Sequence, residues 1–179
     1  MRNMGKLFGP IVLALLGSAS LFAQFAPTGN TTLQVNVGVE AGIRVDTAVT
    51  NLTSPSTFAD YVGSTNFTYK IRTSAGGSGT ITMQVTSDFA PAGGPSVAAP
   101  PDPTDTLAYT CSLIAPGTAC AGSQTASTAA QTGVATFGGD AHSTKLGNGP
   151  NSVSWTLSND PLYDTGAYNA TATFTISAT

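Results

Sequence analysis

The residues able to carry acid–base or metal chemistry are few in this chain. Its single histidine, His142, lies two positions after Asp140 in GGDAHST. That spacing allows both side chains to reach one face of a strand or loop. A catalytic zinc site, however, takes three protein ligands. We therefore interpret this stretch as an ordinary polar turn.

Carboxylates are the other chemical resource of the sequence. Asp160 and Asp164, with Asn159, fall within NDPLYDTG. Calcium takes six to eight oxygen ligands, and such a loop supplies some of them. The simpler interpretation is a tight connection built by Asx-type residues beside Pro161. We keep Asp160 and Asp164 as the metal candidates, and we predict no catalytic residues, no enzyme activity and no cofactor.

The two cysteines lie close together, in the segment CSLIAPGTAC. An even pair in an exported chain is most simply a disulfide, here between Cys111 and Cys120. A metal or redox thiol pair would need companion ligands or a CxxC spacing, and neither is present. Closing so short a loop stabilises a fold by about 2 to 3 kcal/mol.

Aromatic residues were considered as a platform for a carbohydrate. Trp155, the only tryptophan, alternates in phase with Val153 and Leu157 in SVSWTLS, which predicts that it belongs to the core. A carbohydrate-binding module would be favoured if the scattered tyrosines shared one exposed face. The tyrosines concerned are Tyr61, Tyr109 and Tyr163.

The N-terminal residues have the layout of a signal peptide. Arg2 and Lys6 precede the apolar run LFGPIVLALL, and small residues follow it. We predict residues 1–23 to be the signal, with cleavage after Ala23. The remaining chain is then secreted, crossing a periplasm to the cell surface or beyond, with no membrane attachment after cleavage.

Charge is sparse after residue 23 and excludes one class of partner. Four basic residues stand against nine acidic ones, with His142 neutral. Nucleic-acid binding depends on Lys and Arg that neutralise phosphates. We therefore expect no nucleic-acid partner.

The elements that carry these residues are strands. Residues 42–179 alternate short strand patterns with Gly- and Pro-rich turns, which predicts an all-β, immunoglobulin-like antiparallel β-sandwich of seven to nine strands. The stretch TYKIRTSAGGSGTITMQVTS predicts a β-hairpin. Five prolines make residues 89–105 a surface loop.

Both ends of the expected domain have long alternating patterns. Residues 24–41 form an N-terminal strand segment, with Leu33, Val35, Val37, Val39 and Ala41 on one face. The last segment places Tyr168, Phe174 and Ile176 on one face, together with the intervening alanines.

With these two ends, the chain resembles bacterial surface subunits of the chaperone–usher kind, especially the spore coat protein U type. The resemblance rests on TLQVNVGVEAGIRV and on GAYNATATFTISAT, which begins at Gly166. It implies a sandwich that lacks one strand, completed by the N-terminal segment of a neighbouring copy or related subunit. A periplasmic chaperone and an outer-membrane usher are implied as further partners.

On this resemblance, the strand-addition interface consists of the apolar face of residues 33–41 and a groove lined by Tyr168, Phe174 and Ile176. We expect the segment to part from the domain at Gly42. A strand that pairs within its own chain has identical patterning. The alternative is therefore a self-contained secreted surface or matrix protein, or a carbohydrate-binding module.

Overall fold

The computed structural model describes residues 28–179, so the predicted signal peptide lies outside the described residues. Residues 36–179 form one compact unit, and residues 28–35 belong to a separate N-terminal unit and contain no strand or helix. The described part of the chain has no helix, and hence none long and apolar enough to cross a membrane. The strands are β1 (Glu40–Val45), β2 (Tyr61–Arg72), β3 (Gly79–Ala90), β4 (Leu107–Ser112), β5 (Thr118–Ala119), β6 (Gln124–Thr125), β7 (Thr132–Phe137), β8 (Asn148–Leu157) and β9 (Asn169–Ala178).

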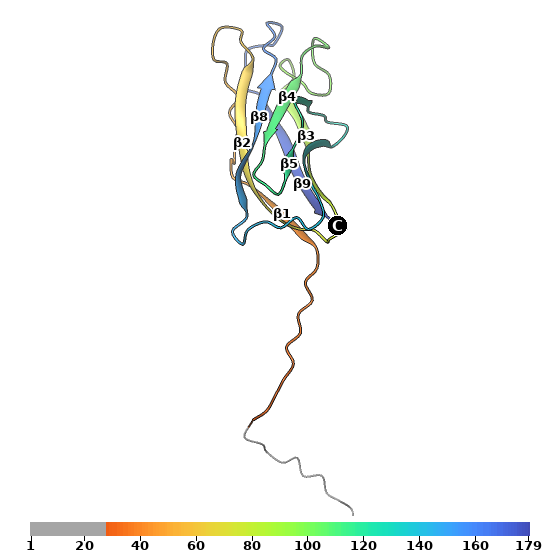
Figure 1. The fold of residues 1–179 in the computed structure, drawn as a ribbon. Helices are drawn as coiled ribbons and strands as arrows, with labels where there is room; N and C mark the ends of the chain where they lie inside the picture. The colour runs from red at the N-terminus through yellow and green to blue at the C-terminus, as the bar shows by residue number, and fades with distance from the viewer. Residues whose placement is uncertain (1–27) are drawn as a thin grey trace, which may run out of the picture. The chain divides into compact units, whose positions relative to one another are not determined.

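The strands form two antiparallel sheets that pack face to face (Figure 1). One sheet has the order β1-β2-β8-β4-β6, and the other has the order β5-β7-β3-β9. Thr, Val and aromatic residues are frequent at the strand positions, because they fit a pleated and half-buried surface. The predicted all-β sandwich is confirmed.

The strand order matches an immunoglobulin sandwich with one position unfilled. In that fold, strands A, B, E and D form one sheet, and C, F and G form the other. Here β1, β2, β8 and β4 take the first four positions, and β3 and β9 take C and F. Within residues 28–179, no strand pairs with the second edge of β9, where strand G would lie.

The predicted hairpin between residues 69 and 85 is wrong. β2 pairs with β1 and β8, whereas β3 pairs with β7 and β9 in the other sheet, so residues 73–78 cross between the sheets. Ile71 and Ile81 both face the shared core and are buried. The inward-facing side chains of β2 and β3 therefore meet across the sandwich. A Gly-rich connection is compatible with a crossover between sheets as well as with a hairpin.

In the N-terminal segment, the strand begins later than the alternating pattern does. Residues 28–39 form no strand, and β1 starts at Glu40. Ala41 and Gly42 pair with Ile71 and Lys70 of β2, so the domain begins before Gly42. Alternation predicts which side chains share a face, but a strand also needs a neighbour to accept its hydrogen bonds.

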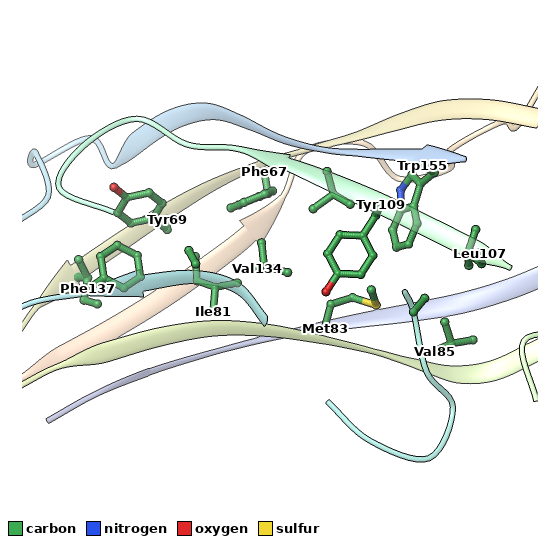
Figure 2. Packing of buried hydrophobic residues seen from close by; sticks show 14 of the residues in the cluster. Phe67, Tyr69, Ile81, Met83, Val85, Leu107, Tyr109, Val134, Phe137 and Trp155 are labelled. Carbon is green, nitrogen blue, oxygen red and sulfur yellow. The ribbon is translucent and has the colours of Figure 1, made fainter. Parts of the chain in front are cut away.

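The core lies between the sheets and is rich in aromatic residues (Figure 2). Trp155 is 5% exposed, which confirms its predicted burial. Its ring lies 5.6 Å from that of Tyr109, and its Nε1–H donates to Thr65 Oγ1 at 2.8 Å. Tyr69 and Phe137 meet edge to face at 5.0 Å. Both aromatic pairs satisfy the preferred ring geometries, and the indole N–H has a partner.

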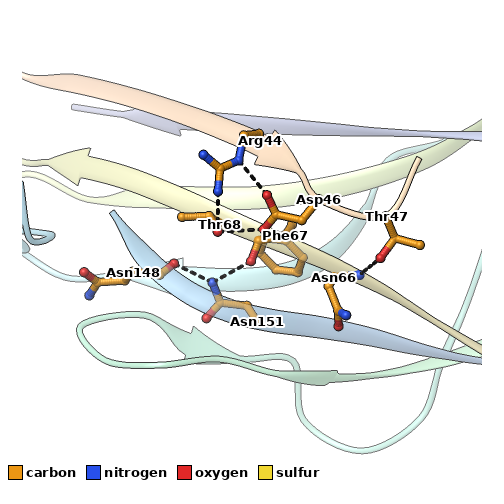
Figure 3. A network of polar contacts seen from close by, with 8 residues as sticks. All are labelled: Arg44, Asp46, Thr47, Asn66, Phe67, Thr68, Asn148 and Asn151. Carbon is orange, nitrogen blue, oxygen red and sulfur yellow. Dashed lines mark hydrogen bonds and ion pairs between the residues drawn. The ribbon is translucent and has the colours of Figure 1, made fainter. Parts of the chain in front are cut away.

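A buried amide joins β2, β8 and the segment after β4 (Figure 3). Asn151 is 2% exposed, and its Nδ2 donates to the carbonyl oxygens of Phe67 at 3.1 Å and Asn148 at 2.7 Å. Its Oδ1 accepts the N–H of Ile114 at 2.8 Å. The β2–β8 register shifts between Phe67 and Tyr69, and Asn151 bonds backbone groups beside that irregularity.

The Pro-rich segment is a surface loop between β3 and β4, organised by one carboxylate. Asp88 Oδ1 accepts the N–H groups of Phe89 and Val97, each at 2.8 Å. Asp88 Oδ2 accepts the Ser96 hydroxyl at 2.6 Å and the Ala98 N–H at 3.1 Å. The five prolines of this segment interrupt strand pairing, and the Asp88 side chain accepts the backbone N–H groups that would otherwise lack a partner.

Candidate functional site

Two long strand edges are free in the described part of the chain. β1 pairs only with β2, and β9 pairs only with β3. The other two edge strands, β5 and β6, have only two residues each. β1 and β9 lie alongside each other without pairing. A long unpaired edge is a template for another strand, so this side of the sandwich is the candidate functional site.

The inward-facing side chains of β9 are incompletely covered. Ile176 and Phe174 stand opposite Ile81 and Met83 of β3, on the same face of the sheet. Both β3 side chains are 0% exposed, whereas both β9 side chains are only half-buried. The same intermediate exposure extends along the whole inward face of β9, at Ala170, Ala172, Phe174, Ile176 and Ala178.

The inward side chains of β1 are likewise less buried than those of its neighbour β2. Ile43 is half-buried and Val45 is 43% exposed, although each faces the same way as a fully buried β2 partner. Those partners are Tyr69 and Phe67, both 0% exposed. We call the partly covered inward side chains of β1 and β9 the open flank; they are Ala41, Ile43, Ala170, Ala172, Phe174, Ile176 and Ala178.

The open flank has an aromatic floor. The rings of Phe67 and Phe174 stack with centroids 5.8 Å apart and an interplanar angle of 29°. Phe67 comes from the sheet of β1 and Phe174 from the sheet of β9, so this pair joins the two sheets beneath the gap. A side chain entering between β1 and β9 would meet an apolar surface.

Polar contacts at both ends hold β1 to β2. Near the start of β1, Arg72 Nε donates to the Gly38 carbonyl at 2.6 Å, and its Nη2 lies 3.1 Å from Glu40 Oε2. Near its end, Arg44 Nε lies 2.6 Å from Asp46 Oδ1 (Figure 3). These are the two ion pairs of residues 28–179. β1 is thus tied on its β2 side and leaves its other edge free.

The Asp46 carboxylate is stabilised in its charged form. Thr68 Oγ1 donates to Asp46 Oδ2 at 2.7 Å, and Arg44 donates to Oδ1. The hydrogen bond from Thr68, followed by that from Arg44, lowers the pKa of Asp46 from its usual 3.8. Stability from this cluster is therefore present above that pKa and is lost as the pH falls through the lowered value.

The predicted insertion residues are exposed in the described structure. Leu33 is 91% exposed, Val35 81%, Val37 66% and Val39 48%. Ala41, the fifth residue predicted for this face, instead belongs to β1 and lines the open flank. Four large apolar side chains at alternate positions before β1 are thus exposed among the described residues.

The predicted groove residues fall into two places. Phe174 and Ile176 lie on the inward face of β9, whereas Tyr168 precedes that strand. The Tyr168 hydroxyl donates to the Asp164 carbonyl at 2.8 Å, and a Cβ on Gly94 would overlap its ring. The Pro-rich loop therefore covers Tyr168. Ala170 and Ala172, predicted to share the face of Phe174 and Ile176, also line the open flank. Ile43 lines it too and is absent from the predicted interface, although its alternation with Ala41 and Val45 was an available signal.

The chemistry-bearing residues do not converge. His142 Nδ1 lies 2.7 Å from the backbone carbonyl of Asp140, within a turn. Asp160 Oδ1 accepts the Leu162 N–H at 2.7 Å, as expected for a tight connection. Within residues 28–179, no three His, Cys, Asp or Glu side chains are grouped so that they could hold a metal ion.

One carboxyl near these loops is electrostatically unusual. The Oδ2 of Asp105 and the hydroxyl of Tyr163 are buried and have no hydrogen-bond partner. Burial, together with the charge of Asp160, raises the pKa of Asp105. Burial and the Asp105 charge likewise raise the pKa of Tyr163.

The tyrosine platform considered for a carbohydrate does not form. Tyr109 is 1% exposed, and its hydroxyl donates to the Gly133 carbonyl at 2.8 Å inside the sandwich. Tyr61 and Tyr163 are half-buried near the Pro-rich loop end. Tyr109 alternates with Leu107 along β4, and this phase places it in the core.

The predicted disulfide between Cys111 and Cys120 is confirmed. The two Cα atoms are 5.5 Å apart, which is the ordinary separation for a bridge. It links β4 to the residue after β5, at the edge of the sandwich that carries the two short strands.

Comparisons with protein-family models, with curated proteins and with solved structures found no match for this chain. The interpretation of the site therefore rests on its geometry.

Proposed function

We propose that this protein is a secreted structural subunit of a cell-surface fibre, pilus or coat that assembles by strand addition. Residues 31–39 of one copy would pair with the free edge of β9 in another copy. Its alternate side chains would then enter the gap between β1 and β9. Main-chain hydrogen bonds supply affinity in such a contact, and the side-chain rows supply specificity.

One observation carries the proposal. In each of two neighbouring strand pairs, the inward side chains of the inner strand are buried where they stand opposite the outer strand, whereas the inward side chains of the outer strand are only partly covered. Both incompletely covered rows face the same gap, between β1 and β9. An added strand in the unfilled G position would complete both rows at once.

The proposed insert has a suitable length and pattern. Nine extended residues span about 30 Å, and the ten residues of β9 span about 33 Å. Leu33, Val35 and Val37 alternate with polar or small residues, as a strand with one buried face requires. Each of these side chains, when fully buried, contributes about 1.5 to 3 kcal/mol.

The resemblance to chaperone–usher subunits supports further partners. A periplasmic chaperone would cover the open flank before assembly, and an outer-membrane usher would order the copies. Covering matters because a half-buried apolar edge of ten residues promotes unspecific pairing. The role is structural, and it requires neither catalytic residues nor a cofactor.

The test uses a domain that begins at Glu40 and a synthetic peptide of residues 31–39. We expect the domain to remain folded and monomeric, and to bind the peptide with 1:1 stoichiometry in calorimetry. Glu40 is the chosen start because β1 begins there. Peptide binding by a folded, non-polymerising domain is the result that strand addition requires.

Two peptide variants provide a matched control. Val35→Lys puts a charge on the inserting face, and it should weaken binding at least thirtyfold. Asn36→Lys puts the same charge on the opposite face, and it should change the affinity less than threefold. Equal effects of the two changes would contradict an alternating insertion.

A second design covers the case in which the shortened domain does not fold. The full-length secreted chain carrying both Val35→Lys and Val37→Lys should stay monomeric and fold, since neither residue has a contact in the described core. Polymers formed by this variant would overturn the proposal, as would an unmodified chain that remains monomeric at every concentration.

A further inference from the structure

The few charges of this domain are unevenly divided between its two ends. We call the end with loops 46–60, 91–106 and 158–168 the tip, and the end where β1 begins and β9 finishes the base (Figure 1). Apart from the Arg44–Asp46 ion pair near the end of β1, the tip carries six acidic side chains, of which Asp60 and Asp164 are exposed, and no basic residue. These six are Asp60, Asp88, Asp102, Asp105, Asp160 and Asp164.

The base carries the remaining basic residues. Lys70 and Arg72 lie at the end of β2, and Lys145 lies in the loop between β7 and β8. The Lys70 side chain lies beside Gly147, two residues from Lys145. Arg72 is paired with Glu40, which leaves Lys70 and Lys145 exposed and without an ion pair. Asp140 is the other acidic residue at this end.

Strand addition would bring two such ends into contact. Residues 31–39 about equal β9 in length, so an inserted segment leaves no linker between Val39 and the base at Glu40. The base of one copy must then abut the next copy. If the segment ran parallel to β9, two bases would meet. If it ran antiparallel, the base would meet the tip.

We propose that the base of one copy docks on the acidic tip of the next copy, as a second contact beside the inserted strand. Lys70 and Lys145 then face the carboxylates of the partner's loops. The opposite orientation would place these lysines against the same lysines. This inference rests on the proposed strand addition, and it adds the direction of the segment and a charged junction.

The expected contribution is to the rate and orientation of assembly. Complementary charge raises association rates and disfavours wrong orientations, and salt screens it over about 8 Å at physiological ionic strength. We therefore expect assembly of the unmodified chain to slow about tenfold between low salt and 0.5 M salt. Peptide binding to the open flank should be much less sensitive, since that contact is apolar.

Charge reversal provides the decisive experiment, on the full-length secreted chain refolded from denaturant. The base-reversed variant carries Lys70→Glu and Lys145→Glu, and the tip-reversed variant carries Asp60→Lys and Asp164→Lys. All four side chains are exposed and accept or donate no hydrogen bond within the described structure. Asp60 and Asp164 are the two exposed carboxylates of the tip, so each variant alone places like charges at the exposed positions of its junction and should assemble about tenfold more slowly in low salt.

An equimolar mixture separates this contact from any folding defect. The exposed Glu side chains introduced at the base of one variant would face the exposed Lys side chains introduced at the tip of the other, and the reverse junction pairs the unmodified lysines with the unmodified aspartates. Light scattering should show assembly restored to within about twofold of the unmodified rate, as copolymers of both variants. Normal assembly of each variant alone, or slow assembly of the mixture, would overturn the charged junction.

Binding of the peptide of residues 31–39 distinguishes strand addition from the charged junction. It should bind both reversed variants within twofold of the unmodified affinity, whatever the outcome for the junction. Binding without any effect of charge would overturn the junction and leave strand addition standing. Failure to bind the unmodified domain would overturn strand addition, and the junction with it.

Discussion

β3 and β9 are neighbours in one sheet, and their inward side chains are directly paired, yet only β3 is fully covered. Ile81 and Ile176 stand opposite each other in the register, with 0% exposure for the first and partial exposure for the second. β3 has a neighbour on both sides, whereas β9 has one. Burial in a sandwich therefore depends on the number of flanking strands as much as on the side chain itself.

The same comparison holds in the other sheet between β2 and β1. Tyr69 is fully buried, and its partner Ile43 is not. The two incompletely covered strands are those that lie beside each other, so the deficit is concentrated on one side of the molecule. The opposite side ends in two-residue strands and a disulfide, and it offers little edge for pairing.

The largest expected effect comes from truncating the two opposed isoleucines. Ile81→Ala should lower the free energy of unfolding by about 3 to 5 kcal/mol, because it leaves a cavity in a closed core. Ile176→Ala should cost about 1 to 2 kcal/mol in the free domain, since part of that side chain is already exposed. Denaturant unfolding of the domain from Glu40 measures both values.

Adding the peptide of residues 31–39 provides a second comparison of the two isoleucine substitutions. When it is bound in excess, the costs of the two substitutions should converge, because Ile176 would gain the cover that it lacks. Equal costs in the free domain would contradict the distinction between the closed and open sides.

Asn151→Ala should produce the next largest effect, on the closed side. It leaves two buried carbonyl groups and the Ile114 N–H without their amide partner, at a cost of about 2 to 4 kcal/mol. Peptide affinity, measured well below the unfolding transition, should stay within threefold. A variant that is as stable as the unmodified domain would show that water replaces the amide.

Removing the disulfide should have a smaller effect. The double substitution Cys111→Ala and Cys120→Ala should lower stability by about 2 to 3 kcal/mol, since the bridge closes a short loop. Peptide binding should be unchanged, because the bridge lies at the edge with the short strands. A loss of binding in a still folded variant would indicate that the two edges are coupled.

The smallest effect is expected at Asp46, whose contacts with Arg44 and Thr68 hold β1 to β2. Asp46→Asn removes the charged acceptor shared by Arg44 and Thr68, and amide exchange of β1 should become faster at pH 7. The pKa of Asp46 is lowered from 3.8, so its contribution is present at neutral pH and disappears as the pH falls below that range. The variant and the unmodified domain should therefore converge as the pH falls through the lowered pKa, and a difference that does not shrink with falling pH would show another cause.

Much of the sandwich could be predicted from local pattern. Period-two alternation identified the strand around Trp155 and the last strand, because each has one face in the core. Proline and glycine predicted a loop over residues 89–105, and in the structure β3 ends at Ala90 and β4 begins at Leu107. The disulfide followed from the proximity of two cysteines in an expected exported chain.

Which strands pair with one another could not be predicted from local pattern. The stretch around the AGGSG turn has a hairpin pattern, but Ile71 and Ile81 belong to different sheets. Alternation defines two faces and does not name a neighbour. For the same reason, the equally regular pattern of residues 33–39 left open whether its partner belongs to the same chain.

Hydrogen exchange on β9 tests the central claim most directly. The β9 amides that point away from β3 should exchange rapidly in the free domain, and adding the peptide of residues 31–39 should protect them at alternate positions. The β3 amides should be protected in both states. Peptide binding that leaves the β9 pattern unchanged, or β9 amides already protected in the free domain, would contradict strand addition at this edge.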